Sequence, residues 1–248
     1  MQSLFDLQEW FGGIDIYLFD QLLKGRFVAG MRVLDAGCGS GRNLVYFLRN
    51  GYECFGVDKS EQAIEQIREL AAELAAHLPA ENFRVEPVES MSFGREANIG
   101  QHGGLSADFA DLDYIEPTGN QQTPLSGRQS ELDRTKDSSG FDVVLSSAVL
   151  HFARDEQQWQ AMVNEMWRLL KPGGIFFVRL ASTIGIEDLV SLVEGRRYHL
   201  PDGSDRFLVD AAMLQRVTAA LGGEFVEPIK TTIVDNMRAM TTWVARKK

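Results

Sequence analysis

The sequence of 248 residues is poor in cysteine and histidine. Its two cysteines, Cys38 and Cys54, are too few for the disulfide framework of a small secreted protein. The four histidines have no zinc-type spacing to one another or to the cysteines. We therefore expect no disulfide scaffold and no metal site.

Basic side chains and long apolar runs are also scarce. Lysine and arginine number 25 against 35 aspartates and glutamates, which gives a net charge of −10. Because affinity for nucleic acid depends on clustered Lys and Arg, we expect a small-molecule substrate and no nucleic-acid partner. No apolar run approaches the roughly 18 residues of a membrane helix, and the acidic N-terminus lacks the basic region of a signal peptide. We expect a cytoplasmic protein without a membrane partner; its oligomeric state is left open.

Between residues 31 and 180, short apolar, β-branched runs alternate with longer amphipathic stretches. This pattern is typical of parallel strands joined by crossover helices. Ser60 has the side chain of a helix N-cap. The predicted strands are 32–35, 53–57, 83–88, 141–146 and 175–180, and the predicted helices are 43–50, 61–77 and 156–170.

The remaining segments flank or interrupt this core. Residues 1–30 contain apolar side chains at helical spacing and are predicted to form a helical cap that packs on the core or lies over the site. Residues 181–248 are predicted to hold a helix at 210–221 and then two strands, near 225–233 and 240–245, as an antiparallel hairpin. Residues 94–140 are an insertion rich in Gly, Ser, Gln, Asp and Pro, either a surface excursion or a substrate-selecting loop. We predict one domain over residues 1–248.

A glycine-rich loop, V-L-D-A-G-C-G-S-G-R-N at residues 33–43, follows the first predicted strand. Glycine is needed where a backbone turns with positive φ and approaches a ligand closely. The helix that follows offers free N–H groups to a phosphate or a carboxylate. The dinucleotide fingerprint G-x-G-x-x-G would require a glycine at position 42, which holds Arg42. The spacing Asp-x-Gly-x-Gly-x-Gly therefore disfavours NAD.

The second predicted strand ends in F-G-V-D, at Asp58. A carboxylate at the carboxyl end of this strand can accept hydrogen bonds from both hydroxyls of a ribose. Alternatively, Asp58 caps the following helix, a role that Ser60 could equally fill.

Taken in order, four segments resemble the successive motifs of class I S-adenosylmethionine (SAM)-dependent methyltransferases. They are the glycine loop, G-Y-E-C-F-G-V-D, F-D-V-V-L-S-S-A-V-L-H-F at 141–152, and L-L-K-P-G-G at 169–174. The resemblance implies a Rossmann-like, doubly wound α/β fold with a mostly parallel seven-stranded sheet, a C-terminal antiparallel hairpin and an N-terminal helical cap. It also implies methyl transfer from SAM, with S-adenosylhomocysteine as product. Arg42, Asn43 and the residues after them are similar to the tellurite- and thiol-methylating branch.

The resemblance also implies where the cofactor binds. Pro87 stands where the family usually has the aspartate of the adenine site, so Glu89 is our candidate for the adenine amino group. A rival position for the adenine loop is A-D-F-A-D-L, residues 107–112. The implied cofactor residues are Asp35, Gly37, Gly39 and Gly41 around the methionine part, Asp58 at the ribose, Val88 and Glu89 at the adenine, Ser147 and Ala148 after the fourth strand, and also Asn43 and Lys59.

On the acceptor side, His151 is a candidate general base, with a structural or capping histidine as the alternative. Asp15, Tyr17 and Arg179 are candidate substrate residues. Their alternatives are surface polarity for Asp15, core packing for Tyr17 and a salt bridge for Arg179.

The function predicted from these residues is methyl transfer from SAM to a small-molecule acceptor by in-line displacement. Because SAM carries an activated methyl group, the protein needs no obligatory catalytic triad. Two alternatives stay open at this point. One is a non-catalytic SAM- or nucleoside-binding module of the same fold. The other is an NAD-dependent oxidoreductase, which is disfavoured because the third glycine of the dinucleotide fingerprint is missing.

Overall fold

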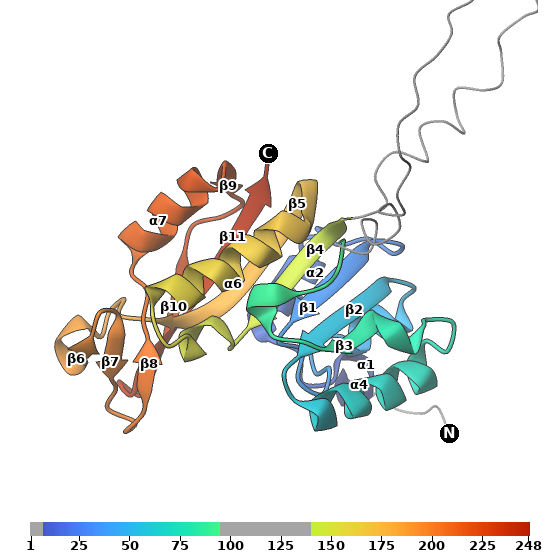
Figure 1. Ribbon diagram of the computed structural model, residues 1–248, viewed down its shortest axis with the longest axis horizontal. Coiled ribbons are helices and arrows are strands. Elements are labelled where there is room, and N and C mark those ends of the chain that lie inside the picture. The colour runs from blue at the N-terminus through green and yellow to red at the C-terminus, as the bar shows by residue number, and fades with distance from the viewer. Residues whose placement is uncertain (1–6, 95–139) are drawn as a thin grey trace, which may run out of the picture. The chain divides into compact units, whose positions relative to one another are not determined.

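The computed structural model describes residues 7–94 and 140–248, and residues 7–92 and 140–248 belong to one compact unit. Its main sheet has eight strands, seven of them in the order β10-β11-β5-β4-β1-β2-β3, with β9 paired to β11 (Figure 1). The predicted insertion and the rival adenine loop at 107–112 lie outside the described residues, except for the insertion's two ends. The role of the insertion stays a prediction, as does the single domain over residues 1–248.

Five strands form the parallel part of the sheet and confirm the strands predicted between residues 31 and 180. They are β1 (Arg32–Ala36), β2 (Glu53–Asp58), β3 (Phe83–Val85), β4 (Phe141–Ser147) and β5 (Leu170–Ser182). Asp35 of β1 is in register with Gly56 of β2 and Leu145 of β4, so the carboxyl ends of these strands meet at one edge. β3 is shorter than predicted because Pro87, which lacks an N–H, begins a turn into the short 3-10 helix η2 (Val88–Ser90).

The predicted crossover helices are α3 (Val45–Arg49), α4 (Glu61–Leu74) and α6 (Glu156–Leu169). Ser60 caps α4 as predicted, because its Oγ accepts a hydrogen bond from the N–H of Ala63 at 3.2 Å. Asp155 caps α6 by accepting from the N–H of Gln158 at 2.7 Å. Both caps begin a helix directly after the loop at the carboxyl edge of a strand.

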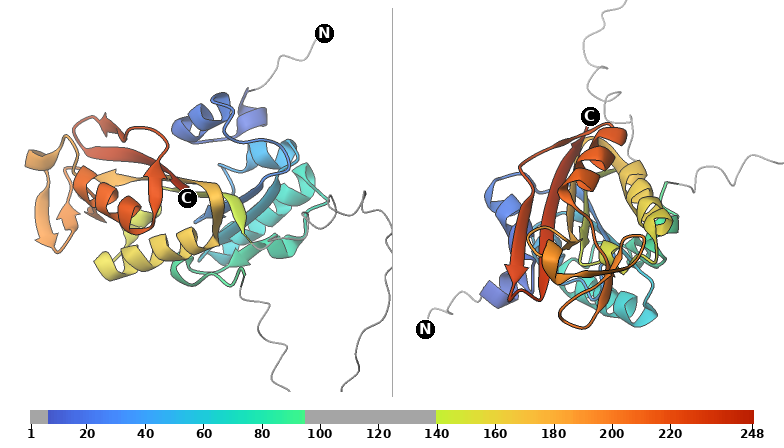
Figure 2. Two further views of the ribbon diagram at one scale, coloured as in Figure 1. Left: turned by 90° about the horizontal axis from the view of Figure 1, so that it is seen from above. Right: turned by 90° about the vertical axis from the view of Figure 1, so that its left-hand side faces the viewer.

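The two faces of the sheet are covered by different helices, as a doubly wound fold requires. Val143 and Phe177 point to the face that packs against α2, α3 and α4. Phe176 and Trp243 point to the opposite face, where Trp167 of α6 packs edge-on against Phe176. Figure 2 shows the N-terminal helices on one side of the sheet and α6 on the other. This alternation buries apolar side chains on both faces of the central strands.

The C-terminal part closes the sheet with the predicted helix and antiparallel hairpin. The helix is α7 (Ala211–Ala220), and the hairpin consists of β10 (Lys230–Val234) and β11 (Arg238–Lys247). β9 (Gly223–Phe225) was not predicted as a separate strand, and it makes the sheet eight-stranded where seven strands were expected. Asp235 and Asn236 turn the hairpin with φ of 51° and 54°, a region that Asp and Asn tolerate better than most residues. β11 runs antiparallel between β5 and β10. The sheet is therefore mostly parallel, in agreement with the predicted fold class.

A second sheet, of three short antiparallel strands, was not predicted. It consists of β6 (Ser191–Glu194), β7 (Arg197–His199) and β8 (Asp205–Phe207). All four residues of β6 are exposed, so the sequence shows no alternation of apolar and polar residues there. Strands of this length and exposure carry too little pattern for detection.

The predicted N-terminal cap consists of α1 (Leu7–Phe11) and α2 (Ile16–Leu23). Gly12, with φ of 57°, ends the first helix, and the Asp15 side chain caps the second by accepting from the N–H of Tyr17 at 3.0 Å. Leu18 of α2 is fully buried against the sheet. Among the described helices, none has the length and apolar character needed to cross a membrane.

Candidate functional site

The glycine loop after β1 is packed so tightly that two of its glycines admit no side chain. Gly37 has φ of 84°, and a Cβ on it would lie 2.4 Å from Cγ2 of Val149. Gly41 has φ of 86°, and its Cβ would lie 2.0 Å from Cδ1 of Ile67. Positive φ and steric exclusion together require glycine at both positions. The loop is thereby held against the residues after β4 on one side and α4 on the other.

Asp58, at the end of β2, ties the glycine loop to the second strand. Its Oδ2 accepts a hydrogen bond from the N–H of Gly39 at 3.0 Å, and its Oδ1 accepts from the N–H of Ser60 at 2.9 Å. Ser60 itself provides the N-cap of α4, so the capping alternative for Asp58 is filled by its neighbour. A carboxylate can accept about four hydrogen bonds, which leaves Asp58 capacity for further donors.

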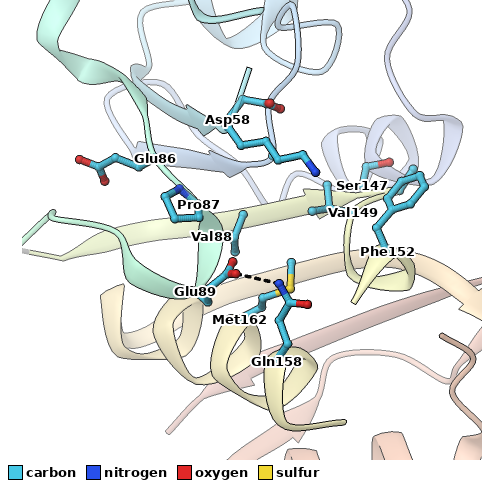
Figure 3. Close-up of a pocket in the computed structure, with 13 residues that line it drawn as sticks. Asp58, Glu86, Pro87, Val88, Glu89, Ser147, Val149, Phe152, Gln158 and Met162 are labelled. Atoms are coloured by element: carbon cyan, nitrogen blue, oxygen red, sulfur yellow. Dashed lines mark hydrogen bonds between the residues drawn. The ribbon is translucent and has the colours of Figure 1, made fainter. Parts of the chain in front are cut away.

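A cavity of about 400 Å³ opens at the carboxyl edge of the parallel strands, within the size range of small-ligand sites. In Figure 3, Glu86 and Pro87 lie at one end of the cavity and Ser147, Val149 and Phe152 at the other. Its lining residues are Gly37, Asp58, Lys59, Glu86, Pro87, Val88, Glu89, Ser147, Ala148, Val149, Phe152, Gln158 and Met162. This edge is where open α/β sheets bind their ligands.

Seven of the eleven predicted cofactor residues line this cavity, and four do not. Those that line it are Gly37, Asp58, Lys59, Val88, Glu89, Ser147 and Ala148, and those that do not are Asp35, Gly39, Gly41 and Asn43. The sequence did not single out Glu86, Phe152, Gln158 or Met162. Gln158 and Met162 lie on α6, far along the chain from the β3 end that they face, and no motif marks them.

Glu89 is held by a short chain of hydrogen bonds that begins at Arg154, just before α6. Its Oε1 accepts from Nε2 of Gln158 at 2.7 Å (Figure 3). Oε1 of Gln158 accepts from the backbone N–H and from Nε of Arg154, at 2.9 Å and 3.0 Å. Because Arg154 occupies the amide oxygen of Gln158, the amide NH₂ group is directed at Glu89. The second carboxylate oxygen of Glu89 has capacity for another donor.

Asp35 is a buried carboxyl group without a hydrogen-bond partner. It is 1% exposed, and neither of its carboxyl oxygens is within hydrogen-bond geometry of a donor. Burial raises its pKa to about 7, the charge of Asp58 adds to this rise, and the charge of Arg42 and the nearby amide of Asn43 oppose it. An unsatisfied buried polar group in a native fold calls for a physical explanation, and a cationic ligand group at this position would provide one.

Asp15, Tyr17 and Arg179, the three predicted substrate residues, lie together. Oδ2 of Asp15 accepts from Nη1 of Arg179 and from Oγ of Ser147, at 3.0 Å and 3.1 Å. The guanidinium of Arg179 also lies over the ring of Tyr17, with Cζ 4.8 Å from the ring centroid. Asp15 is only 5% exposed, so the surface-polarity alternative for it is wrong, and the salt-bridge alternative for Arg179 is found.

Two residues of the glycine loop extend this cluster. Oδ1 of Asn43 accepts from the backbone N–H of Asp15 at 3.0 Å. The guanidinium of Arg42 donates to the carbonyl of Gly13 at 3.1 Å and to Oγ of Ser147 at 3.2 Å. These hydrogen bonds fasten the N-terminal cap to the glycine loop and to β4, next to the cavity.

His151, the predicted base, is 7% exposed and does not line the cavity, although Val149 and Phe152 on either side of it do. Its Nδ1 accepts a hydrogen bond from the N–H of Ala181 at 3.3 Å. Burial lowers its pKa to about 4, and two nearby arginine charges act in the same direction. This geometry favours the structural alternative, and the role as a base stays a prediction.

Cysteine and metal chemistry do not enter the site in the part of the chain that the structure describes. Cys38 and Cys54 are buried free thiols, and burial raises the pKa of each. Within residues 7–94 and 140–248, no group of three or more His, Cys, Asp or Glu side chains could hold a metal ion.

Residues 17–215 match a family described as a methyltransferase domain. No protein in the curated set matches the sequence.

Solved structures show the same fold at low sequence identity. Magnesium protoporphyrin IX methyltransferase (ChlM) from Synechocystis PCC 6803, with bound SAM, has a TM-score of 0.54 and 15% identity, covering 94% of this chain and 77% of that one. The 1,6-didemethyltoxoflavin-N1-methyltransferase from Burkholderia thailandensis, with bound 1,6-didemethyltoxoflavin and S-adenosylhomocysteine, has a TM-score of 0.56 and 18% identity, covering 98% and 81%. TehB from Haemophilus influenzae has a TM-score of 0.55 and 18% identity, covering 96% and 63%.

Proposed function

The chain belongs to a family of methyltransferase domains, and from this premise we propose that it transfers a methyl group from SAM to a small-molecule acceptor by in-line displacement. The observation that carries the proposal is the cavity between the glycine loop, Asp58 and the residues after β4. The toxoflavin methyltransferase, with its small-molecule substrate bound, is a structural neighbour that supports a small acceptor.

The residues around the cavity fit the parts of SAM. Asp35 lies behind the cavity lining, on β1 next to the glycine loop, and we assign its unpartnered carboxyl to the positively charged amino group of the methionine part. Asp58 has capacity for the ribose hydroxyls. Val88, only 6% exposed, offers an apolar contact for the adenine ring, and the free carboxylate oxygen of Glu89 can accept from its amino group.

When bound, SAM supplies a methyl group that is already activated on a sulfonium centre. The chain's own task is to position the two reactants and to exclude water. Ser147, Val149 and Phe152 lie at the end of the cavity opposite Glu86 and Pro87 (Figure 3). We assign this end to the methyl group and the acceptor, because Glu89 belongs to the adenine side. Holding the acceptor in line with the methyl–sulfur bond lowers the entropic part of the barrier.

The test is a calorimetric titration of the purified chain with SAM, S-adenosylhomocysteine and NAD, followed by assay of S-adenosylhomocysteine release with a broad acceptor panel. We expect SAM to bind and NAD not to bind. Asp58→Asn is expected to weaken SAM binding by about tenfold or more, the value of a charge-assisted hydrogen bond. Asp188→Asn, which makes the same change on an exposed carboxylate, is the control.

Two outcomes of this test would contradict the proposal. NAD binding in place of SAM would favour the oxidoreductase. Tight SAM binding with no release of S-adenosylhomocysteine across the panel would favour a non-catalytic module of the same fold.

A further inference from the structure

The carboxylates that line the cavity all have hydrogen-bond donors. Asp58 accepts from two backbone N–H groups. Glu86 accepts from the N–H and the hydroxyl of Ser92, at 2.8 Å and 2.5 Å. Glu89 accepts from Gln158 at 2.7 Å. The negative charges of the cavity wall are therefore already stabilised by the protein.

The cations beside the cavity are in the opposite situation. Lys59 lines the cavity, and Arg206 of β8 has its Cζ 4.9 Å from the ring centroid of Phe152, another lining residue. Neither forms an ion pair with any described carboxylate, and the guanidinium of Arg206 donates only to the carbonyl of its neighbour Asp205, at 2.8 Å. Unpaired cations next to a cavity stand out in a chain of net charge −10. They create a local attraction for anions.

No carboxylate in the described part of the chain forms an ion pair with Arg206. The carboxylate of Asp202 accepts hydrogen bonds from the N–H and the hydroxyl of Ser204. These hydrogen bonds, together with the charges of Arg206 and Arg238, lower the pKa of Asp202. Asp205 pairs with His199 on the neighbouring strand. Arg179, the arginine that the sequence suggested as a substrate residue, is paired with Asp15. Arg206 is thus an arginine beside the cavity and next to Phe152 that is not paired with a carboxylate.

Phe152 adds an apolar surface at the same place. It lines the cavity and is 58% exposed, which is unusual for a large aromatic side chain that packs beside a buried core. Figure 3 places it with Ser147 and Val149, at the end of the cavity assigned to the methyl group. A ligand bound here would meet an aromatic ring and a guanidinium together.

No free base faces this end of the cavity in the described part of the chain. Among the lining carboxylates, Glu86 lies at the opposite end of the cavity, and Asp58 and Glu89 are assigned to the ribose and the adenine. Nδ1 of His151 accepts from Ala181, and burial holds the pKa of this histidine near 4. A proton on the acceptor would therefore have no group to receive it. An acceptor that is already ionised at neutral pH needs no such group.

We propose that the acceptor is a small organic carboxylate that packs on Phe152 and is held by Arg206, with Lys59 adding to the attraction. This rests on the proposed function and deepens it. In the reaction, a carboxylate oxygen supplies the electron pair of the new oxygen–carbon bond. The methyl–sulfur bond breaks with its electron pair on sulfur, so that the products are a methyl ester and S-adenosylhomocysteine and no proton is released.

The first experiment measures binding, with the protein saturated with S-adenosylhomocysteine. Phenylacetate, phenylacetamide and inorganic sulfate are titrated calorimetrically into the wild type, Arg206→Gln and Arg216→Gln. The last variant removes the same charge from the exposed face of α7 and is the matched control. We expect phenylacetate to bind the wild type and the control alike, and Arg206→Gln about tenfold or more weakly, as the loss of a charge-assisted hydrogen bond predicts.

The second experiment measures turnover of a panel of aromatic and aliphatic monocarboxylates, each with its matched carboxamide, at saturating SAM. Mass spectrometry is expected to detect methyl esters from the carboxylates and no product from the amides. Because no base takes part, kcat is expected to stay constant between about pH 6 and pH 9. Arg206→Gln is expected to raise KM for the carboxylate, and Phe152→Ala to raise it for the aromatic members most.

Three results would overturn the inference: amides bound as tightly as carboxylates, an Arg206→Gln variant indistinguishable from Arg216→Gln, or no ester from any carboxylate. If sulfate bound as tightly as phenylacetate, the proposal of an organic acceptor would be wrong, because charge alone would then explain the binding. Titration of SAM into the same three proteins, free of S-adenosylhomocysteine, tests the proposed function separately from this inference. Failure of SAM binding refutes the proposed function, whereas SAM binding without discrimination of carboxylates refutes only this inference.

Discussion

Replacing Asp35 by asparagine is expected to remove one pH-dependent contribution that lowers the free energy of unfolding. Burial raises the pKa of Asp35 from 3.8 to about 7 in the folded chain. The folded state therefore binds this proton more tightly than the unfolded state does. The stability that comes from the protonated group is fully present below pH 3.8 and is lost as the pH rises towards 7.

The magnitude follows from the size of this rise. At about 1.36 kcal/mol for each pKa unit, the ionised carboxyl destabilises the ligand-free chain by about 4 kcal/mol above pH 7. An asparagine side chain at this position would remain neutral at every pH. Its buried amide has a cost of its own, but this cost does not vary with pH. The difference in stability between Asp35→Asn and the wild type is therefore the quantity to follow.

The assay is thermal unfolding of both proteins, without ligand, from pH 5.5 to pH 8.5. Between pH 5.5 and 7 the difference is expected to change by about 2 kcal/mol in favour of the variant, or roughly 4–8 °C in melting temperature. Glu61→Gln, on the first turn of α4, makes the same chemical change at an exposed position and is expected to show no such trend. A constant difference between Asp35→Asn and the wild type across this range would refute the reasoning.

The same group predicts how SAM binding depends on pH. If the ionised carboxyl of Asp35 receives the amino group of SAM, protonation must weaken binding. Between pH 8 and pH 6 the dissociation constant of the wild type is expected to rise about tenfold. The Asp35→Asn variant should bind SAM more weakly and without this dependence, as calorimetry at the two pH values would show. Equal pH dependence in both proteins would place the amino group elsewhere.

Three further predictions concern residues in the cavity wall or next to it. Gly37→Ala is expected to lower stability by about 1–3 kcal/mol and to abolish SAM binding, because its Cβ meets Val149; unfolding and calorimetry test this, and normal binding would contradict it. Gln158→Leu should weaken SAM binding several-fold, with a smaller effect on an analogue that lacks the adenine amino group; equal effects would show that Gln158 does not act through Glu89. Arg179→Met should destabilise the chain by about 2–4 kcal/mol in chemical denaturation, because it leaves a buried carboxylate unpaired.

The strands of the parallel sheet could be predicted because each is a short apolar run bounded by turn residues. Such a pattern reports burial on both faces of a central strand, a property that depends little on the rest of the chain. The small sheet of β6, β7 and β8 could not be predicted for the opposite reason. Its strands are short and largely exposed, and no periodicity distinguishes them from a loop. This small sheet places Arg206 beside Phe152. Because the sheet was not predicted, the position of Arg206 next to the cavity was not predicted either.

The candidate site divides in the same way. Gly37 and Asp58 were predicted because positive φ at a tight turn and a carboxylate at the end of a strand are local requirements that a motif records. The partners of Glu89 were not predicted, because Gln158 lies 69 residues away and approaches only when α6 packs beside η2. Similarly, the sequence named Asp15 and Arg179 separately and did not predict that they would neutralise each other.

By itself, the sequence determined the fold class, the order of the motifs and the position of the glycine-rich loop, because these depend on local backbone conformation and on the burial pattern of single elements. Only the tertiary structure decided which charges near the site are free. Asp15 forms an ion pair with Arg179, and the N–H of Ala181 donates to Nδ1 of His151. Arg206 lies beside Phe152 without an ion-pair partner among the described carboxylates. The charge and proton affinity of a side chain depend on what surrounds it in space, and residues far apart in the chain provide those surroundings.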